Sequence, residues 1–449
     1  MTNQRHSTTA ILSTPILLCV LVLSANVVAR AEAPIGPSGT SGRIRGDLNV
    51  WAWSIAAASL EQRIPAFRAK YPSVGININM SGSSTANLRL MLTLSSGVGA
   101  PDVSQIEIAN APRYSMTGRL TDLTEVAAPY ADRFVPASWA NCTLNGRVYA
   151  IPWDIGPCAV FYKRPVFARY GIDPGAIETW ADYIDAGKRI VERSGGKTMM
   201  LTLPASYVSA MFEILMQQNG GQVFDDQGRV AIDSGQTREV LAVLESMLTA
   251  GITSNTAVFS QAFYTSLGTE EIASFPMAAW LGGFIKNYAP ETSGEWGVFP
   301  LPALTPGGLR ASTAGGSVLI IPAQSMRDDA AWNFVRFMLC NEQSQLAHYR
   351  NSDLFPALHT AYDDPFFDEP DPFYGGQRVR RLFAEDITRI PQLNRTEDWR
   401  EASRYISQEM SHWAANGCQE TDAMLARLAR QLSERLRREL APQVPEGTP

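Results

Sequence analysis

The sequence predicts an α/β protein with more than one lobe. Its 449 residues exceed what one small hydrophobic core accommodates, so at least two lobes are expected. Strand and helix patterns alternate from residue 48 onward, which predicts parallel strands joined by right-handed crossovers. The composition, with 45% hydrophobic and 18% charged residues, is typical of a globular chain.

The first strand, helix and strand follow one another directly. Residues 48–53 (LNVWAW) form an expected strand, and the helix after them ends before Tyr71-Pro72. Residues 74–80 alternate apolar and polar side chains, as a half-buried strand does. The elements expected later are a helix around Leu88 and Leu92, a strand at 101–108, a helix at 180–193 opened by a Thr179–Asp182 capping box, a strand at 198–204, helices at 208–218 and 240–248, a strand at 315–323, a helix marked by Trp332, Val335 and Leu339, and a last helix with Leu425, Leu428, Leu432 and Leu436 on one face.

Residues 146–172 (GRVYAIPWDIGPCAVFYKRPVFARYGI) are unusual, because they read as two buried strands separated by a polar, aromatic joint. Trp153 and Asp154 form this joint, with Pro152 before them and Gly156-Pro157 after them. An acid among apolar neighbours is costly to bury unless it binds something. Asp154 is therefore the strongest polar candidate for a binding site.

The amino terminus is typical of a secretory signal peptide. Residues 16–23 form a short apolar core, and Ala29-Arg30-Ala31 supplies a small-x-small cleavage pattern. Leu18 precedes Cys19 where a lipoprotein motif requires a small residue, so no lipid anchor is expected. We expect a soluble periplasmic protein with a signal peptide at 1–31, a flexible tether at 32–46 and a disordered tail at 441–449.

Four of the five cysteines lie beyond the predicted cleavage site, and an exported protein can form disulfides. Cys142 with Cys158, and Cys340 with Cys418, would be the local pairs. The alternative is that some of these cysteines are small buried hydrophobic residues. No CxxC motif occurs, so neither a redox nor a zinc role is expected.

The usual enzyme motifs are missing from the sequence. SGGKT at 194–198 lacks the first glycine of a phosphate loop and is interpreted as a turn that ends a helix. HExxH and GxSxG do not occur, and the acidic run at 363–373 lacks the ligand spacing of a calcium loop. The net charge of −6 disfavours nucleic acid as a partner. We expect no cofactor and no metal.

Several stretches, taken in order, resemble one family. They are VWAWSIAAASLEQRIPAFRAKYP, PDVSQIEIANAPRYSMTGRLTDLT, GRVYAIPWDIGPCAVFYKRPVFARYGI, TWADYIDAGKRI, QQNGGQVFDDQGRV, FPMAAWLGGFI, WGVFPLPA, AGGSVLIIPA with AWNFVRFM, and IPQLNRTEDW. Together they are similar to the extracellular solute-binding proteins of ABC importers, in the branch that binds maltose, lactose and related oligosaccharides. The resemblance covers nearly the whole mature chain.

This resemblance implies a periplasmic-binding-protein-like fold, in which two α/β lobes are joined by hinge crossovers and a ligand cleft lies between them. The implied lobes are residues 47–153 with 300–345, and residues 154–299 with 346–440. The implied crossings are 148–163, 296–302 and 344–355.

Two physical arguments select candidate ligand-binding residues. Ligands bind at the carboxyl ends of strands in open α/β sheets, which selects Trp53, Ser54 and Glu107. The crossing at 146–172 adds Trp153 and Asp154. Aromatic rings cover the apolar faces of a sugar, and carboxylates and amides bind its hydroxyls.

The resemblance adds two tryptophans. Trp280 and Trp399 match residues that stack on sugar in maltose-binding relatives. The remaining candidates are Gly315, Gly316 and Ser317, whose backbone amides are expected just before a strand, and Asn219.

The expected function is therefore non-catalytic. The chain would capture a mono- or oligosaccharide as a monomer and deliver it to the membrane permease of an ABC importer. Residues 108–114 lack the Asp-Arg pair of maltose binders, which disfavours maltose itself. Two alternatives remain: a secreted carbohydrate-active enzyme with Glu107 and Asp154 as acid and base, and a binding protein of the same fold for a non-sugar solute.

Overall fold

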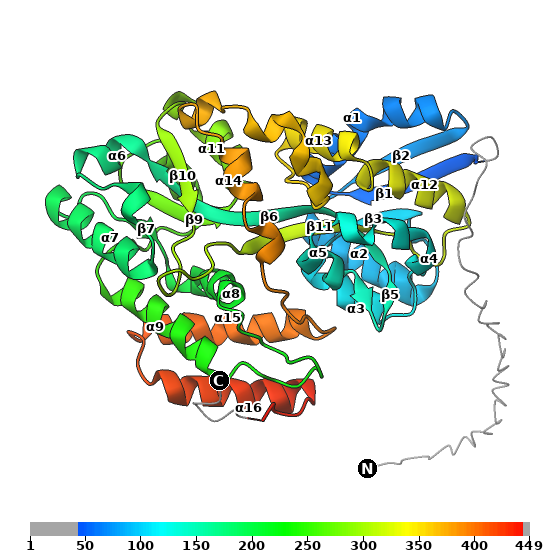
Figure 1. Cartoon of the computed structure of the whole chain (residues 1–449). Coiled ribbons are helices and arrows are strands. Elements are labelled where there is room, and N and C mark those ends of the chain that lie inside the picture. The colour runs from blue at the N-terminus through cyan, green and yellow to red at the C-terminus, as the bar shows by residue number, and fades with distance from the viewer. Residues whose placement is uncertain (1–43, 443–449) are drawn as a thin grey trace, which may run out of the picture. The chain divides into compact units, whose positions relative to one another are not determined.

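The computed structural model describes residues 44–442. The predicted signal peptide, the predicted tether up to residue 43 and the tail from residue 443 lie outside the described residues. A seven-stranded sheet organises the described chain, with the order β10-β6-β11-β3-β1-β2 and with β9 also paired to β6 (Figure 1). Between residues 44 and 442, no helix is both long and apolar enough to cross a bilayer.

The predicted strand, helix and strand at the amino-terminal end are confirmed. They are β1 (Gly46–Ala52), α1 (Ser54–Lys70) and β2 (Val74–Met80), and β1 pairs with β2 in parallel over its whole length. β3 (Val103–Glu107) pairs with the other side of β1, also in parallel. β1 begins at Gly46, the last residue of the stretch 32–46 that the sequence predicts as a tether.

α2 (Ser83–Ser96) is the helix expected around Leu88 and Leu92, and Gly97 is its carboxyl-terminal cap. Leu90 and Leu94 are buried, whereas Leu88 and Leu92 are 65% and 62% exposed. The helix carries leucines on both faces, so helical spacing alone could not decide which pair faces the core.

The stretch predicted as two strands with a joint is one continuous strand, β6 (Ala150–Lys163). Its first part pairs with β11 (Thr313–Ile320), and its second part pairs with β9 (Ser274–Ala278) and β10 (Trp296–Pro300). β6 therefore crosses between two groups of strands. Gly156 allows this crossing, because a Cβ at this position would lie 2.0 Å from the carbonyl oxygen of Ala314 in β11.

The helices along the rest of the chain largely follow the sequence pattern. Thr179 and Asp182 form the predicted capping box at the start of α7, whereas the strand expected at 198–204 is reduced to the two residues of β7. The remaining elements are α3 (Ala111–Ser115), α4 (Thr124–Ala127), α5 (Pro136–Asn141), β4 (Thr143–Leu144), β5 (Arg147–Val148), α6 (Arg164–Arg169), α7 (Trp180–Ser194), β7 (Leu201–Thr202), α8 (Val208–Gln218), α9 (Gly235–Thr249), β8 (Thr253–Ser254), α10 (Gln261–Leu267), α11 (Leu281–Tyr288), α12 (Asp328–Leu339), α13 (Glu342–Ser352), α14 (Val379–Ala384), α15 (Trp399–Ala415) and α16 (Thr421–Leu436), with short 3-10 helices between some of them.

Helix packing positions the carboxyl-terminal part of the chain. α16 packs against α15 and buries Leu425, Leu428 and Leu432, as its pattern predicts. α13 packs against α1 and α12, so the lobe boundary implied at residue 345 falls inside a helix that contacts the amino-terminal elements.

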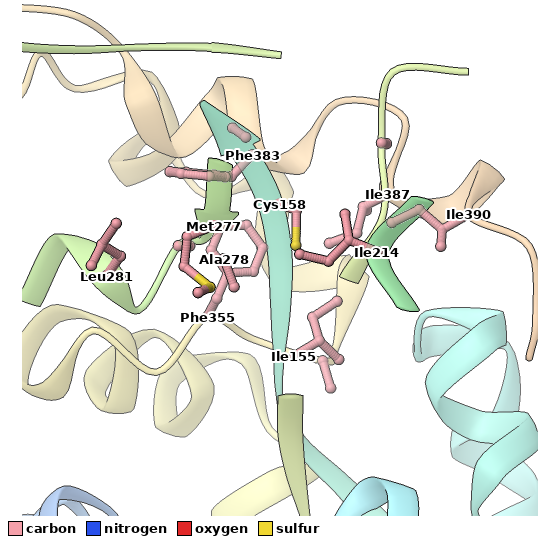
Figure 2. Close-up of a cluster of buried hydrophobic side chains, with 14 of the residues drawn as sticks. Ile155, Cys158, Ile214, Met277, Ala278, Leu281, Phe355, Phe383, Ile387 and Ile390 are labelled. Carbon is pink, nitrogen blue, oxygen red and sulfur yellow. The ribbon is translucent and has the colours of Figure 1, made fainter. Parts of the chain in front are cut away.

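The core beneath the crossing joins segments that are far apart in the sequence. Figure 2 shows Ile155 and Cys158 of β6 in a cluster with Ile214 of α8 and Met277 of β9. All four cysteines between residues 44 and 442 are buried free thiols. Of the two alternatives for these cysteines, the structure therefore supports small buried residues over disulfides.

Candidate functional site

A cavity of about 900 Å³ lies where β1 and β3 end. Because parallel strands present their carboxyl ends at one edge of the sheet, Trp53 and Glu107 meet there. β6, β11, α8, α11 and α15 contribute further walls. The lining residues are Trp53, Ile55, Ala56, Asn87, Gln105, Glu107, Ile108, Ala109, Asn110, Asp154, Glu213, Phe259, Tyr264, Trp280, Phe284, Gly315, Gly316, Ser317, Leu354, Arg395, Trp399, Arg400 and Ser403.

The structure brings most of the candidate residues from the sequence to this cavity. Those in its lining are Trp53, Glu107, Asp154, Trp280, Gly315, Gly316, Ser317 and Trp399. They come from six separate segments of the chain, so only the tertiary structure assembles them.

Trp153 does not line the cavity, which corrects the sequence prediction. Its side chain is 0% exposed and packs edge-on against His348, with ring centroids 5.2 Å apart. Successive side chains of a strand point to opposite faces, so Trp153 faces the core because Asp154 faces the cavity.

Asn219 is not in the lining either. The side-chain amide of Asn219 donates to the carbonyl oxygen of Gln236 and to Oε2 of Glu239 at 2.8 Å, away from the cavity. Ser54 begins α1 directly after Trp53, but its side chain is outside the described set.

Asp154 is held in the cavity wall by Ser317 of β11. Its Oδ1 accepts hydrogen bonds from the Ser317 backbone N–H at 3.0 Å and from the Ser317 hydroxyl. Burial raises the pKa of this carboxyl group to about 6, although both hydrogen bonds oppose the rise.

The glycines beside Ser317 have a different role from the predicted one. Gly315, Gly316 and Ser317 lie inside β11 rather than before it, and the Ser317 amide is already bonded to Asp154. Gly316 has a φ of 116°, and a Cβ there would lie 2.7 Å from the Asp154 carbonyl oxygen. These glycines let β11 approach β6 closely at the cavity floor.

Aromatic rings form one wall of the cavity. The Trp280 indole N–H donates to the Ala314 carbonyl oxygen at 3.1 Å, and its ring lies 5.9 Å from the rings of Phe259 and Phe284. Phe284 stacks in turn on Tyr264. Phe259 has a φ of 65°, which is a strained conformation for a bulky residue, and is 40% exposed.

Trp399 lines the cavity but does not offer it an open ring face. The residue is only 5% exposed, and the Arg395 guanidinium lies 4.9 Å above its ring. The guanidinium therefore occupies one face of the ring on which a sugar was expected to stack.

Sequence reasoning missed several polar and aromatic lining residues. Glu213 accepts a hydrogen bond from the Ser403 hydroxyl at 2.9 Å, and burial raises the pKa of its carboxyl group against the influence of Arg395. The apolar helix VSAMFEILMQQ contains Glu213 as its one acid, a signal that could have found it. Phe259, Tyr264 and Arg395 carry no local pattern that separates them from core or surface residues.

The described residues contain no group of three or more His, Cys, Asp or Glu side chains that could hold a metal ion. The cavity lining combines aromatic rings with carboxylate, amide and guanidinium groups. It is suited to binding an organic solute.

Comparison with known proteins agrees with this architecture. Residues 51–345 match the family model of the bacterial extracellular solute-binding proteins. An arabinooligosaccharide-binding protein of Halalkalibacterium halodurans is 28% identical, with 67% of each chain covered. One of the same description from Bacillus subtilis is 25% identical, with 90% of this chain and 95% of the relative covered.

Solved structures share the fold. The sugar-binding protein MalE of Xanthomonas citri superimposes with a TM-score of 0.75 at 19% identity, covering 87% of this chain and 98% of that one. The fold is therefore the two-lobed periplasmic-binding-protein-like fold. Since the family model spans more than half of its length, the chain belongs to the bacterial extracellular solute-binding protein family.

Proposed function

We propose that this chain binds a mono- or oligosaccharide in its cavity and delivers it to the membrane permease of an ABC importer. The observation that carries the proposal is the lining, which combines an aromatic wall around Trp280 with the carboxylates of Asp154 and Glu107. Sugar rings have apolar faces and polar edges, so they need both kinds of contact. The relatives described as arabinooligosaccharide-binding proteins support the same solute class.

Each part of the lining has a role in this proposal. Trp53 and Trp280 are both half-buried and would cover the apolar faces of the sugar. Asp154 and Glu107 would accept hydrogen bonds from its hydroxyls. Trp399 would contribute an edge rather than a stacking face.

The proposed site lies between two lobes, residues 47–153 with 300–345 and residues 154–299 with 346–440. We move the boundary at residue 345 to residue 353, which places α13 in the first lobe, because α13 packs against α1 and α12. We further propose that the mature protein is a periplasmic monomer, as expected for the carrier of a small solute.

The proposal is tested by thermal unfolding in the presence of a panel of neutral mono- and oligosaccharides that includes arabinotriose. A sugar that binds only the folded state raises the melting temperature. Trp280→Ala should weaken the binding of that sugar by about tenfold or more, because a stacking partner is lost. Tyr405→Ala, on α15 outside the cavity, is the matched control and should keep the wild-type affinity. Unchanged affinity in Trp280→Ala would contradict the proposed site.

The enzyme alternative predicts turnover by Glu107 and Asp154. We propose that the sugar is released unaltered. Chromatography of the bound sugar after prolonged incubation should recover it intact, whereas shorter products would support a hydrolase.

A further inference from the structure

Glu213 and Arg395 line the cavity together and have no partner that fully satisfies either of them. Glu213 lies in α8, and Ser403 is its hydrogen-bond donor. Arg395 lies just before α15, and its Nη1 donates to Oδ1 of Asn141 at 3.3 Å. Within residues 44–442 the two side chains form no ion pair with each other or with any other group.

Both side chains are partly buried, and one of their polar atoms lacks a hydrogen-bond partner among the described residues. The Nε of Arg395 is buried and has no hydrogen-bond acceptor within the described part of the chain. Burial lowers the pKa of the Arg395 guanidinium and raises the pKa of the Glu213 carboxyl group. In each case the effect of burial on the pKa is larger than the opposing effect of the other side chain's charge. Leaving buried polar groups without partners destabilises a folded protein. Such groups in a cavity wall indicate a role in binding.

Neighbouring side chains hold both groups in position. The Arg395 guanidinium lies 4.9 Å above the ring of Trp399, and the Glu213 carboxylate is held by Ser403 one turn further along α15. α15 therefore orients the donor and the acceptor together. Because these contacts already restrict both side chains, little further conformational freedom is lost when they bind a ligand.

The chemistry of the pair points to one kind of ligand group. A hydroxyl both accepts and donates a hydrogen bond, so it can accept from Arg395 and donate to Glu213 at once. A ligand carboxylate could only accept. It would also meet the negative charges of Glu107, Asp154 and Glu213, against which the lining sets only Arg395 and Arg400.

We infer that Arg395 and Glu213 form a polar subsite that binds a hydroxyl group of the ligand and discriminates against acidic sugars. This inference rests on the proposed function and extends it to the class of saccharide, which is a neutral one.

The test compares a neutral and an acidic probe by isothermal titration calorimetry. The neutral probe is the sugar of the panel with the largest thermal shift, and the acidic probe is trigalacturonic acid. The wild-type protein should bind the neutral probe much more tightly than the acidic one. Glu213→Gln and Arg395→Gln should each weaken the neutral probe by about tenfold, the size expected for the loss of a hydrogen bond to a charged group. Glu213→Gln should also narrow the ratio between the two affinities, a change that a purely structural role would not produce.

Matched controls are Glu239→Gln and Arg404→Gln, which lie outside the cavity lining and should leave both affinities unchanged. Arg395→Lys keeps the charge and serves as a second variant if Arg395→Gln does not fold. The inference would be overturned, and the proposed function left standing, by either of two results. One is that Glu213→Gln binds the neutral probe as tightly as the wild-type protein does. The other is that the wild-type protein binds trigalacturonic acid tightly. If no neutral sugar binds the wild-type protein, the proposed function fails and the inference fails with it.

Discussion

Asp154 has a half-buried carboxylate in the cavity wall, and it accepts two hydrogen bonds from Ser317. Burial raises the pKa of this group from 3.8 to about 6. The folded protein therefore holds the proton more tightly than the unfolded chain does. The contribution of this group to the free energy of unfolding is fully present below about pH 4 and is lost as the pH rises through 6.

Sugar binding should depend on pH in the opposite direction. The ionised carboxylate is the stronger acceptor for a sugar hydroxyl, so affinity should fall as the pH drops from 7 to 5. Calorimetric titrations at half-unit steps of pH measure the affinity, and urea unfolding of the sugar-free protein measures the stability. Asp154→Asn should abolish most of the pH dependence of the affinity and most of the pH dependence of the stability. An affinity that stays constant across this range would exclude Asp154 as a ligand acceptor.

Phe259 shows how a residue at the site departs from ordinary backbone preferences. Its φ of 65° places it in the left-handed region, which disfavours every residue with a Cβ. Phe259→Gly and Phe259→Ala both remove the ring, but only glycine relieves the strain. We expect the glycine variant to be more stable than the alanine variant by about 1 kcal/mol in urea unfolding. Alanine is normally more stabilising than glycine. If the alanine variant is the more stable one here too, the backbone at residue 259 is unstrained.

At the scale of elements, β6 connects the two strand groups, and its geometry depends on Gly156. A Cβ at this position would meet the Ala314 carbonyl oxygen at 2.0 Å and the Ala278 Cβ at 3.0 Å. The carbonyl is part of the backbone of β11 and cannot move alone. Gly156→Ala should therefore destabilise the protein by about 1–3 kcal/mol or more, the usual cost of overpacking.

A matched control exists in α9. Gly235 is the first residue of that helix, and a Cβ there would meet no atom within 4 Å. Gly235→Ala should leave the free energy of unfolding unchanged or raise it slightly. The two variants are compared by urea unfolding, and an equal effect of both would contradict the close approach of β6 and β11.

At the scale of the whole molecule, the proposed ligand site depends on segments from most of the chain. Trp53, Asp154, Trp280 and Trp399 span almost 350 residues of sequence and line one cavity. Periplasmic binding proteins close around their ligands by a hinge motion. A ligand that contacts both strand groups should favour the closed form, because only there are all contacts made.

We therefore expect a bound sugar to reduce the radius of gyration. Small-angle X-ray scattering of the wild-type protein, with and without the sugar that raises the melting temperature, measures this change. The Trp280→Ala variant under the same conditions is the control and should show a smaller change at a given sugar concentration. Identical scattering with and without saturating sugar would argue against closure on binding.

Local sequence patterns determined a large part of this protein. The alternation at 74–80, the Thr179–Asp182 capping box and the leucine face of α16 are patterns that are complete within a short stretch of sequence, so a short window contains the information. The sequence also predicted where strands end. Trp53 and Glu107 were therefore expected at the carboxyl-terminal edge of the sheet, where β1 and β3 end.

Only the tertiary structure decided which face each element buries and which distant side chains meet. Trp153 and Asp154 are adjacent in sequence, and the pairing of β6 with β11 sends one to the core and the other to the cavity. Arg395 and Glu213 are more than 180 positions apart, and no local pattern marks Arg395. The physical reason is that burial and hydrogen-bond partners are supplied by other segments of the chain, whose positions depend on how the whole protein packs.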